Sequence, residues 1–458
     1  MRFSTSDVAS ELGGDLVGPD VGVDGVSIDS RTLLPGQLFV PIVAERDGHE
    51  FIPSALEAGA PAYLTARPPV GATAVVVADT GRALLRLGEV ARARLAGGVV
   101  GITGSVGKTT TKELLRHCLA SSFPVGASES SFNNELGLPL TLCNVPDDAR
   151  WVVLEMGARG VGHVRRLAAV ARPDVGIVTS VAMAHVEFFG DLEGVARAKS
   201  ELVAALPETG VAVLNFDDPR VARMAAISPC PVLGYAVEAD AEVRAEDVVV
   251  DAELRPRFRL RSPWGDGEVR LALRGPQQVP NALAAAATAL WCGVGTEAVV
   301  QALSEVTGPP LRMEVHRSEA GPVLVVDCYN ANPASTEAAL CSLAALPASR
   351  RVAVLGLMAE LGPETEAEHR RLRLLAERLG IEVVGYRTDL YGGARVDDVP
   401  SAVALLRELG PGDAALVKGS RVARLEEVAR AYGEAAGVQS LLPAASTAGT
   451  SMRRLSSP

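Results

Sequence analysis

Lysine is scarce in this chain of 458 residues. Its 44 lysine and arginine side chains include only four lysines, Lys108, Lys112, Lys199 and Lys418, so the other 40 are arginines. Arginine is a planar fork that keeps its charge, whereas lysine is a compact ammonium group that can lose its proton. In a chain that uses arginine ten times as often as lysine, a lysine indicates a position where arginine cannot replace it. We use this as a first filter for functional residues.

Long apolar runs are absent as well, although 48% of the residues are hydrophobic. A membrane-spanning helix needs about 20 consecutive apolar residues, whereas the most apolar stretch, residues 282–294, is shorter and contains Thr288. Residues 1–14 contain no basic segment followed by an apolar core, so we expect no signal peptide. The sequence therefore predicts no membrane span.

Neither an excess of basic charge nor a paired-cysteine motif is present. The formal net charge is -11, which argues against non-specific binding to nucleic acid or to a membrane surface. The six cysteines form no Cys-x-x-Cys motif. In a chain of this length they indicate reduced, mostly buried thiols. We expect a cytoplasmic protein without a nucleic-acid partner.

Three zones of different pattern divide the chain, as expected at about 150 residues per domain. Residues 1–92 mix short apolar runs with turns and predict a small α/β unit. Residues 93–310 and 311–437 each alternate apolar runs of strand length with helical stretches, the pattern of a mostly parallel sheet. Residues 308–310, Gly-Pro-Pro, fit a linker. Residues 438–458 are rich in Ser, Ala and Pro and predict a disordered tail.

A phosphate-binding loop opens the second zone. Residues 103–110, Thr-Gly-Ser-Val-Gly-Lys-Thr-Thr, separate an apolar run from a helical stretch. In such a loop backbone N–H groups close around phosphate oxygens, Lys108 reaches the β- and γ-phosphates, and Thr109 holds Mg²⁺. Ile102 stands where the GxxxxGK[ST] motif needs its first glycine, which counts against the common transport, motor and switch proteins. The alternative is an ordinary glycine-rich turn with a surface lysine. The predicted nucleotide-binding residues of the loop are Gly104, Ser105, Val106, Gly107, Lys108, Thr109 and Thr110.

Two further side chains follow strands of the same predicted sheet. Glu155 comes directly after the apolar run 151–154, and His185 follows another run. A carboxylate at a strand end can coordinate Mg²⁺, and His185 would lie at the same sheet edge, at a second metal or at phosphate. The alternatives are a glutamate in a surface turn and a structural or exposed histidine.

Lys199 lies in a helical stretch where arginine would usually serve. A neutral lysine amine reacts with CO2 to give a carbamate, which is a metal-binding anion, and arginine cannot do so. The alternative is a solvated helix lysine, which the scarcity of lysine disfavours.

Together these motifs resemble the Mur ligase family, the ATP-dependent amide ligases of peptidoglycan precursor assembly. The resemblance extends over about residues 20–435. Within the family it is closest to the group that adds D-alanyl-D-alanine, because residues 329–333 read Tyr-Asn-Ala-Asn-Pro and the Asp-Asn-Pro-Arg motif of the diaminopimelate- or lysine-adding group is missing. The segments that carry it are residues 28–31, 36, 39, 47–49, 104–113, 131–139, 155–157, 171–174, 184–199, 327–333 and 416–421.

The resemblance implies an α/β fold with three domains. These are a UDP-sugar-binding domain, a central ATP-binding domain with a mostly parallel sheet, and a C-terminal Rossmann-like ligase domain. It implies a monomer that uses ATP and two Mg²⁺ ions to phosphorylate the terminal carboxylate of UDP-N-acetylmuramoyl-tripeptide. The amine of D-Ala-D-Ala then attacks the acyl phosphate.

The family's residue roles map onto positions of this chain. The resemblance assigns catalysis to Lys108, His185 and Lys199, the last as a carbamate. Metal binding is assigned to Thr109, Glu155, His185 and Lys199. Nucleotide contacts beyond the loop are assigned to Asn281, Arg312 and Asp327. Substrate binding is assigned to Ser30, Arg31, Asp47, His49, Asn133, Asn134, Tyr329, Asn330, Asn332 and Lys418.

Departures from the family's pattern leave other functions open. Gln277 and Gln278 stand where a His-Asn pair is usual, and Leu357 stands where an acidic residue is usual. Residues 181–183, Val-Ala-Met, stand where the family usually has an Asn-Ile-Gly-type run before the histidine at position 185. One alternative is a related amide ligase that joins a different carboxylate or amine in specialised metabolism. Another is a catalytically silent binding protein, and the intact phosphate loop and metal residues count against it.

Overall fold

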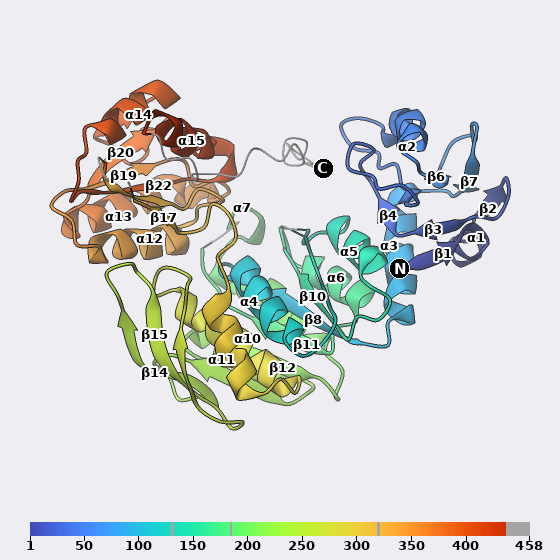
Figure 1. The fold of residues 1–458 in the computed structure, drawn as a ribbon, viewed down its shortest axis with the longest axis horizontal. Coiled ribbons are helices and arrows are strands. Elements are labelled where there is room, and N and C mark those ends of the chain that lie inside the picture. The colour runs from blue at the N-terminus through green and yellow to red at the C-terminus, as the bar shows by residue number, and fades with distance from the viewer. Residues whose placement is uncertain (130–131, 184–185, 318–320, 437–458) are drawn as a thin grey trace.

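Three large β-sheets follow one another along the chain, with a two-stranded ribbon beside the first, in a computed structural model that describes residues 1–129, 132–183, 186–317 and 321–436. The N-terminal and C-terminal sheets lie at opposite ends of the molecule, and the central sheet lies between them (Figure 1). Helices flank each sheet. The predicted α/β fold with a mostly parallel central sheet is confirmed.

The N-terminal unit is built on a five-stranded sheet of order β2-β7-β6-β5-β4. Only the β2–β7 pair is antiparallel, and a separate β1–β3 ribbon lies beside helix α1. The strands are β1 (Arg2–Ser4), β2 (Asp15–Val17), β3 (Gly22–Asp24), β4 (Val26–Ser27), β5 (Leu38–Phe39), β6 (Ala62–Thr65) and β7 (Thr73–Val76). The helices are α1 (Thr5–Leu12), η1 (Gly48–Phe51), α2 (Ile52–Glu57) and α3 (Thr80–Arg94).

Helix α3 joins this unit to the central sheet. It packs against α5 (Gly137–Asn144) and α6 (His163–Ala171) of the central sheet. A Cβ on Gly88 would lie 2.8 Å from the Cα of Pro139, so only glycine permits so close a helix contact. One apolar core therefore continues from the N-terminal unit to one face of the central sheet.

The central sheet has nine strands in the order β16-β15-β14-β13-β12-β11-β8-β10-β9. All pairs from β9 to β14 are parallel, and the two pairs beyond β14 are antiparallel. The strands are β8 (Gly98–Thr103), β9 (Val125–Ala127), β10 (Trp151–Glu155), β11 (Val175–Val178), β12 (Val211–Asn215), β13 (Val232–Ala236), β14 (Val243–Val250), β15 (Pro256–Arg261) and β16 (Gly267–Arg270).

Helices cover both faces of this sheet, so its inner strands are continuous apolar runs. Val99 faces the core shared with α3, whereas Val100 and Ile102 face the core beneath α4 and α10. The first face is covered by α5, α6 and α8 (Leu192–Ala204), and the second by α4 (Lys108–Ala120), α10 (Gln278–Trp291) and α11 (Thr296–Glu305). The short helices α7 (Val186–Phe189), α9 (Pro219–Ala222) and η2 (Arg223–Ile227) follow β11 and β12.

The C-terminal sheet has six strands in the order β17-β18-β22-β19-β20-β21, with only the β17–β18 pair antiparallel. Helices on both faces make it doubly wound, as predicted. The strands are β17 (Glu314–His316), β18 (Val323–Val326), β19 (Arg351–Leu355), β20 (Glu382–Tyr386), β21 (Ala394–Val396) and β22 (Ala414–Lys418). The helices are α12 (Pro333–Ala345), η3 (Gly362–Glu364), α13 (Thr365–Arg378), α14 (Val399–Arg407), η4 (Arg421–Ala423) and α15 (Glu426–Ala435).

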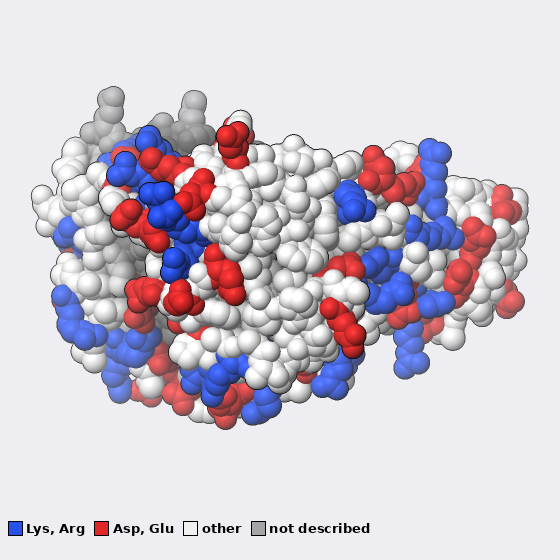
Figure 2. Space-filling model, turned by 90° about the horizontal axis from the view of Figure 1, so that it is seen from below, with Lys and Arg blue, Asp and Glu red and all other residues white. Residues whose placement is uncertain are grey.

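Charge is distributed in both signs over the surface. On the face in Figure 2, basic and acidic side chains are interleaved toward the two ends and sparse across the middle. Among the residues that the structure describes, no helix is long and apolar enough to cross a membrane.

Candidate functional site

The phosphate loop, residues 104–107, connects β8 to α4 at the carboxyl edge of the central sheet. Gly104 and Gly107 have φ values of +145° and +87°, where a side chain is strained. Neighbouring side chains also leave no room for one. A Cβ on Gly104 would lie 1.9 Å from Thr179 Oγ1, and a Cβ on Gly107 would lie 2.2 Å from Asn281 Oδ1. The loop therefore has the backbone shape and close packing that its sequence predicts.

Lys108 begins α4 and folds back over the loop. Its ammonium group donates a 2.7 Å hydrogen bond to the carbonyl of Gly104. Burial lowers the pKa of Lys108, the carboxylate of Glu155 opposes that shift, and the positive charge of Arg312 adds to it. Lys108, Glu155 and Arg312 are thus close enough to form one electrostatic cluster at the loop.

Glu155 ends β10 beside the first turn of α4 and is only 2% exposed. Its Oε2 accepts a 2.9 Å hydrogen bond from Thr109 Oγ1, and its Oε1 accepts a 2.9 Å bond from Asn133 Nδ2. A carboxylate and a hydroxyl are hard oxygen donors of the kind that Mg²⁺ prefers. The donor set at Thr109 and Glu155 therefore fits Mg²⁺. Among the described residues, no group of three or more metal-binding His, Cys, Asp or Glu side chains exists.

Arg312 reaches this site from the segment that leads into the C-terminal sheet. Its Nη2 donates a 3.1 Å hydrogen bond to Thr109 Oγ1, and its guanidinium stacks 4.1 Å above the ring centroid of Tyr329. Its Nε is buried and has no hydrogen-bond partner among the residues that the structure describes. A buried donor of this kind is costly unless a ligand satisfies it, so Arg312 fits an anionic group bound over the loop.

Lys199 lies on α8 and is only 3% exposed, with its Nζ 5.7 Å from the ring centroid of Phe189. Burial lowers its pKa to about 7, the charge of Lys108 adds to the shift, and Glu155 and Glu201 oppose it. The structure therefore brings Lys199 into the cluster of Lys108 and Glu155. His185, the other predicted second-metal residue, lies outside the described residues.

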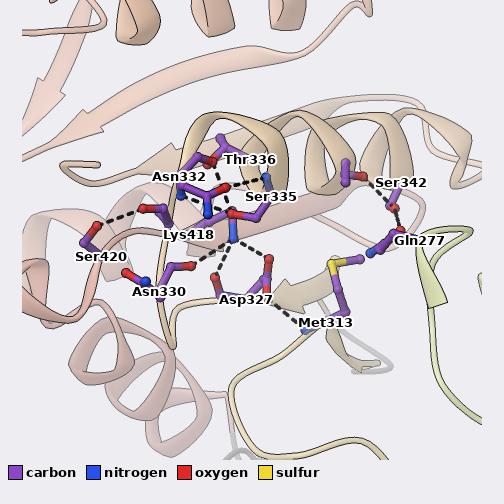
Figure 3. A network of polar contacts seen from close by, with 12 residues as sticks. Gln277, Met313, Asp327, Asn330, Asn332, Ser335, Thr336, Ser342, Lys418 and Ser420 are labelled. Carbon is purple, nitrogen blue, oxygen red and sulfur yellow. Dashed lines mark hydrogen bonds and ion pairs between the residues drawn. The ribbon is translucent and has the colours of Figure 1, made fainter. Parts of the chain in front are cut away.

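A second polar network occupies the carboxyl ends of β18 and β22. Lys418 is 1% exposed and donates to Asp327 Oδ2 at 2.5 Å and to the carbonyl of Asn330 at 3.1 Å. The other carboxylate oxygen of Asp327 accepts from the N–H of Met313 at 3.3 Å. Figure 3 shows Lys418 pointing between Asp327 and Asn330, beside the first turn of α12. The structure thus gathers three of the predicted C-terminal residues, Asp327, Asn330 and Lys418, into one network.

Asn332 adjoins this network, whereas Gln277 and Asn281 lie at the start of α10 in the central domain. Asn332 is the N-cap of α12 and accepts from the N–H of Ser335 at 2.9 Å. Gln277, at the start of α10, accepts a 3.3 Å hydrogen bond from Ser342 of α12, which ties the central sheet to the C-terminal sheet (Figure 3). Asn281 donates to Gln278 Oε1 at 2.9 Å and faces the phosphate loop at Gly107.

The neighbouring residues Asn133 and Asn134 make different contacts. Asn133 bonds the buried Glu155 carboxylate, whereas Asn134 Oδ1 accepts from the N–H groups of Leu136 and Gly137 and so supports the start of α5. Asn133 therefore belongs to the cluster around Glu155 in this structure. Its predicted contact with substrate stays a prediction.

The predicted residues of the N-terminal unit form a separate group. Asp47 accepts from the N–H and the Nδ1 of His49 at 2.9 and 2.6 Å and pairs with Arg67. His49 Nε2 accepts from the N–H of Ala66 at 3.1 Å, so both ring nitrogens hold the turn together. Arg31 pairs with Asp29 beside Ser30, at 2.5 Å. Substrate binding by these residues stays a prediction.

Sequence patterns missed several residues that support the site. Lys112 is completely buried, and its Nζ donates to the carbonyl of Ser128 at 2.5 Å and pairs with Glu113 at 3.1 Å. Lys112 lies within residues 104–113, which carry the family resemblance, and it is one of the four lysines, but no role was predicted for it. Glu201 and Asp218 also bond backbone groups close to the site, and nothing in their local sequence distinguishes them from surface carboxylates.

Known proteins share both the sequence pattern and the fold. Residues 102–289 match the Mur ligase middle domain, and residues 311–421 match the Mur ligase glutamate ligase domain. The UDP-N-acetylmuramoyl-tripeptide--D-alanyl-D-alanine ligase of Mycobacterium tuberculosis is 40% identical in an alignment that covers 89% of this chain and 91% of that protein.

Solved structures agree with the sequence comparison. MurF from Acinetobacter baumannii is 28% identical, with a TM-score of 0.87 over 95% of this chain and 99% of that one. MurF from Thermotoga maritima in complex with ADP is also 28% identical, with a TM-score of 0.80 over 90% of this chain and 97% of that one. The two domain matches and the 40% identity to the Mycobacterium tuberculosis ligase agree with the phosphate loop and the buried Glu155. The chain belongs to the Mur ligase family.

Proposed function

We propose that this protein is an ATP-dependent amide ligase that adds D-alanyl-D-alanine to UDP-N-acetylmuramoyl-tripeptide in peptidoglycan precursor synthesis. The observation that carries the proposal is the cluster of Lys108, Thr109 and Glu155 at the phosphate loop. It is set in a chain similar over most of its length to ligases named for this reaction. The ADP complex of the Thermotoga maritima relative supports ATP as the phosphoryl donor.

The reaction proceeds in two steps. An oxygen of the tripeptide's terminal carboxylate attacks the γ-phosphorus of ATP, the bond to the β-γ bridging oxygen breaks, and ADP leaves. The amine of D-Ala-D-Ala then attacks the carbonyl carbon of the acyl phosphate. Inorganic phosphate leaves, the nitrogen loses a proton, and the amide remains. Negative charge spreads over the transferring phosphoryl group, so catalysis depends on fixed positive charges and on positioning.

The chain supplies those charges at two points. Lys108 follows the phosphate loop, and its ammonium group would move from the Gly104 carbonyl to the phosphate oxygens. Arg312 would place its unpartnered Nε–H on the same phosphates from the C-terminal side. The contact of Arg312 with Thr109 brings the C-terminal sheet to the loop, which would keep water away from the acyl phosphate.

Thr109 and Glu155 would hold the first Mg²⁺, and His185 with carbamylated Lys199 would hold or orient a second. When bound, Mg²⁺ neutralises charge on the phosphate oxygens. In this proposal Asn133 keeps the Glu155 carboxylate oriented through its 2.9 Å hydrogen bond.

Carbamylation of Lys199 is supported by its surroundings. A buried amine whose pKa is lowered to about 7 is partly neutral at that pH. Its lone pair attacks the carbon of CO2, a C–N bond forms, and a proton leaves to solvent. The product is an anion, which suits a position beside Lys108 and a bound cation better than a second ammonium group does.

The division of labour follows the zones of the sequence. We assign residues 1–92, with Ser30, Arg31, Asp47 and His49, to binding the UDP-sugar, residues 93–310 to binding ATP, and residues 311–437 to closure and to binding the amine through the loops of the C-terminal sheet. All six cysteines are free thiols, which fits a reducing compartment. We propose a monomer that acts in the cytoplasm.

A reconstituted reaction tests the function. Purified protein is incubated with ATP, Mg²⁺, UDP-N-acetylmuramoyl-tripeptide and D-Ala-D-Ala, and phosphate and products are measured. We expect a UDP-linked pentapeptide and one phosphate per amide. Lys108→Ala is the matched control and should release neither. If the wild-type protein forms no pentapeptide but hydrolyses ATP with another carboxylate and amine, the related ligase of specialised metabolism is the correct function.

A further inference from the structure

The segment that follows β11, residues 179–182, lies along the phosphate loop and is bonded to it. We call this segment the brace. Thr179 Oγ1 donates to the carbonyl of Val106 at 2.6 Å. The N–H of Ser105 donates to the carbonyl of Ser180 at 2.9 Å, and the N–H of Val106 donates to Ser180 Oγ at 3.2 Å. The loop is therefore held by a neighbouring segment as well as by its own backbone.

The side chain of Ser105 completes this attachment. Its Oγ accepts from the N–H of Ala182 at 2.9 Å and donates to the carbonyl of Ala182 at 3.0 Å. The Ser105 hydroxyl therefore bonds the brace in both directions. The backbone N–H of Ser105 also bonds the brace, so its predicted contact with the nucleotide stays a prediction.

Two side chains at the end of β12 anchor the brace from behind. Asn215, which is 8% exposed, donates from Nδ2 to the carbonyl of Thr179 at 2.9 Å. Asp218 Oδ2 accepts from the N–H of Val181 at 2.7 Å. Asp218 Oδ1 accepts from the N–H groups of Arg220 and Val221 and so caps α9. Asn215 and Asp218 are thus connected to the phosphate loop through the brace.

The phosphate loop needs such support for a physical reason. Two of its four residues are glycines, which lose more backbone freedom on ordering than other residues do. Gly107, the N-cap of α4, offers no capping side chain. A binding loop that is ordered in advance does not spend binding free energy on its own ordering.

We propose that Asp218 and Asn215 are positioning residues for nucleotide binding, which hold the phosphate loop in its binding shape through the brace. The inference rests on the proposed ATP-dependent function and assigns residues outside the phosphate loop to it. Neither residue reaches the loop directly in this structure, so their effect passes through residues 179–182.

Asp217 provides a matched comparison. It is adjacent to Asp218 and also bonds backbone N–H groups, those of Val237, Glu238 and Ala239 at 2.6, 3.0 and 2.8 Å. Those residues follow β13 and have no hydrogen bond to the phosphate loop among the described residues. The two aspartates therefore share their chemistry but hold different loops.

The experiment measures the affinity of the full chain for Mg·ADP by calorimetric titration, with thermal melting as the check on folding. We expect Asp218→Ala to weaken ADP binding about tenfold, the effect of losing a hydrogen bond to a charged group. Asp217→Ala should stay within about twofold of the wild type, although it loses the same number of backbone bonds, three. Asp218→Asn keeps one oxygen for the α9 cap, where asparagine is well tolerated, and faces Val181 with an amide donor. It should melt near the wild type and still bind ADP weakly.

Each outcome decides the proposal. Equal weakening by Asp217→Ala and Asp218→Ala would show a general loss of structure and overturn it, as would unchanged affinity in both Asp218 variants. If the wild type binds no ADP, the proposed function fails and the inference fails with it. If the wild type binds ADP and ligates while Asp218→Ala binds equally well, only the inference fails.

Discussion

At the residue scale, three of the four lysines are buried and the fourth is half-buried. Lys112, Lys199 and Lys418 are 0%, 3% and 1% exposed, and Lys108 is half-buried at the phosphate loop. Each ends in a compact group of acceptors or charges, such as the Asp327 and Asn330 oxygens around Lys418. A three-proton ammonium group fits such pockets better than a planar guanidinium does.

Lys199 gives the sharpest test of this view. Lys199→Ala should abolish ligation, because it removes the amine that forms the carbamate. Lys199→Arg should not restore it, since arginine keeps its charge and forms no carbamate. Product formation is measured with saturating substrates, and a short carboxylic acid should partly rescue Lys199→Ala. Full activity of Lys199→Arg would refute a carbamate role.

The lowered pKa of Lys199 also sets a pH dependence. The folded protein releases the proton from this lysine near pH 7, whereas the unfolded chain holds it up to the usual value of 10.5. The neutral, CO2-reactive fraction therefore rises with pH through about 7. ¹³C NMR with labelled bicarbonate should show a carbamate signal that grows from pH 6 to pH 8 and is missing in Lys199→Ala. Between these two pKa values the unfolded state binds more protons, so this group makes the free energy of unfolding increase with pH.

The buried pair of Lys418 and Asp327 predicts a large stability effect. Lys418→Met should lower the free energy of unfolding by about 3–5 kcal/mol, because it leaves the Asp327 carboxylate without its charge partner. Adding Asp327→Asn should recover part of the loss, since the uncompensated charge is then removed. Denaturant unfolding of both single variants and the double variant measures the coupling. Additive losses would contradict it.

At the element scale, the position of α8 depends on its contact with α6. The N-cap of α6 is Gly162, which has no side chain to cap the helix. Glu201 of α8 supplies the cap, because its carboxylate accepts from the N–H groups of Gly162 and Arg165 at 2.5 and 3.0 Å. This bond fixes the helix that carries Lys199 relative to α6.

Removal of this distant cap should therefore weaken both helices. Glu201→Ala should cost about 1–2 kcal/mol of unfolding free energy, as the loss of an N-cap does. Glu193→Ala, on the same helix, is the matched control, because Glu193 is exposed and pairs only with surface arginines. It should change the stability by less than about 0.5 kcal/mol. Equal losses in the two variants would contradict the capping role.

At the scale of the whole molecule, a few polar contacts link the central and C-terminal sheets near the site. Arg312 bonds Thr109, Gln277 bonds Ser342, and Arg317 pairs with Glu253 at 2.6 Å. A site completed by such contacts can form only when the two sheets approach each other. Closure and nucleotide binding are therefore expected to be coupled.

Arg312→Ala should loosen this approach. Small-angle X-ray scattering should give a larger radius of gyration for the variant than for the wild type, because one bond between the two sheets is lost. Arg370→Ala, which removes an exposed pair with Glu366 on α13, is the control and should leave the scattering unchanged. Superimposable curves for Arg312→Ala and the wild type would contradict this prediction.

Apolar runs predicted several parallel strands, such as β10, because a strand buried on both faces is a continuous apolar run in sequence. The antiparallel strands β14 to β16 were missed. In β15 buried Phe258 and Leu260 alternate with the exposed arginines Arg257 and Arg259, which is the period-2 pattern of a half-buried strand and could have predicted it. Their pairing is decided by contacts with β13 and α10, which no local pattern encodes.

The order of amino acids alone thus determines the phosphate loop, the strands that end beside it and the scarce lysines that belong to it. These features are local. Glycines permit the backbone angles of the loop, and the spacing of apolar residues along the chain determines which face of a helix or strand is buried. The tertiary structure decided which distant groups share a charge environment, such as Lys199 with Lys108 and Glu155. It also decided which neighbours hold the loop, since Asp217 and Asp218 look alike in sequence and only packing sends Asp218 to the brace.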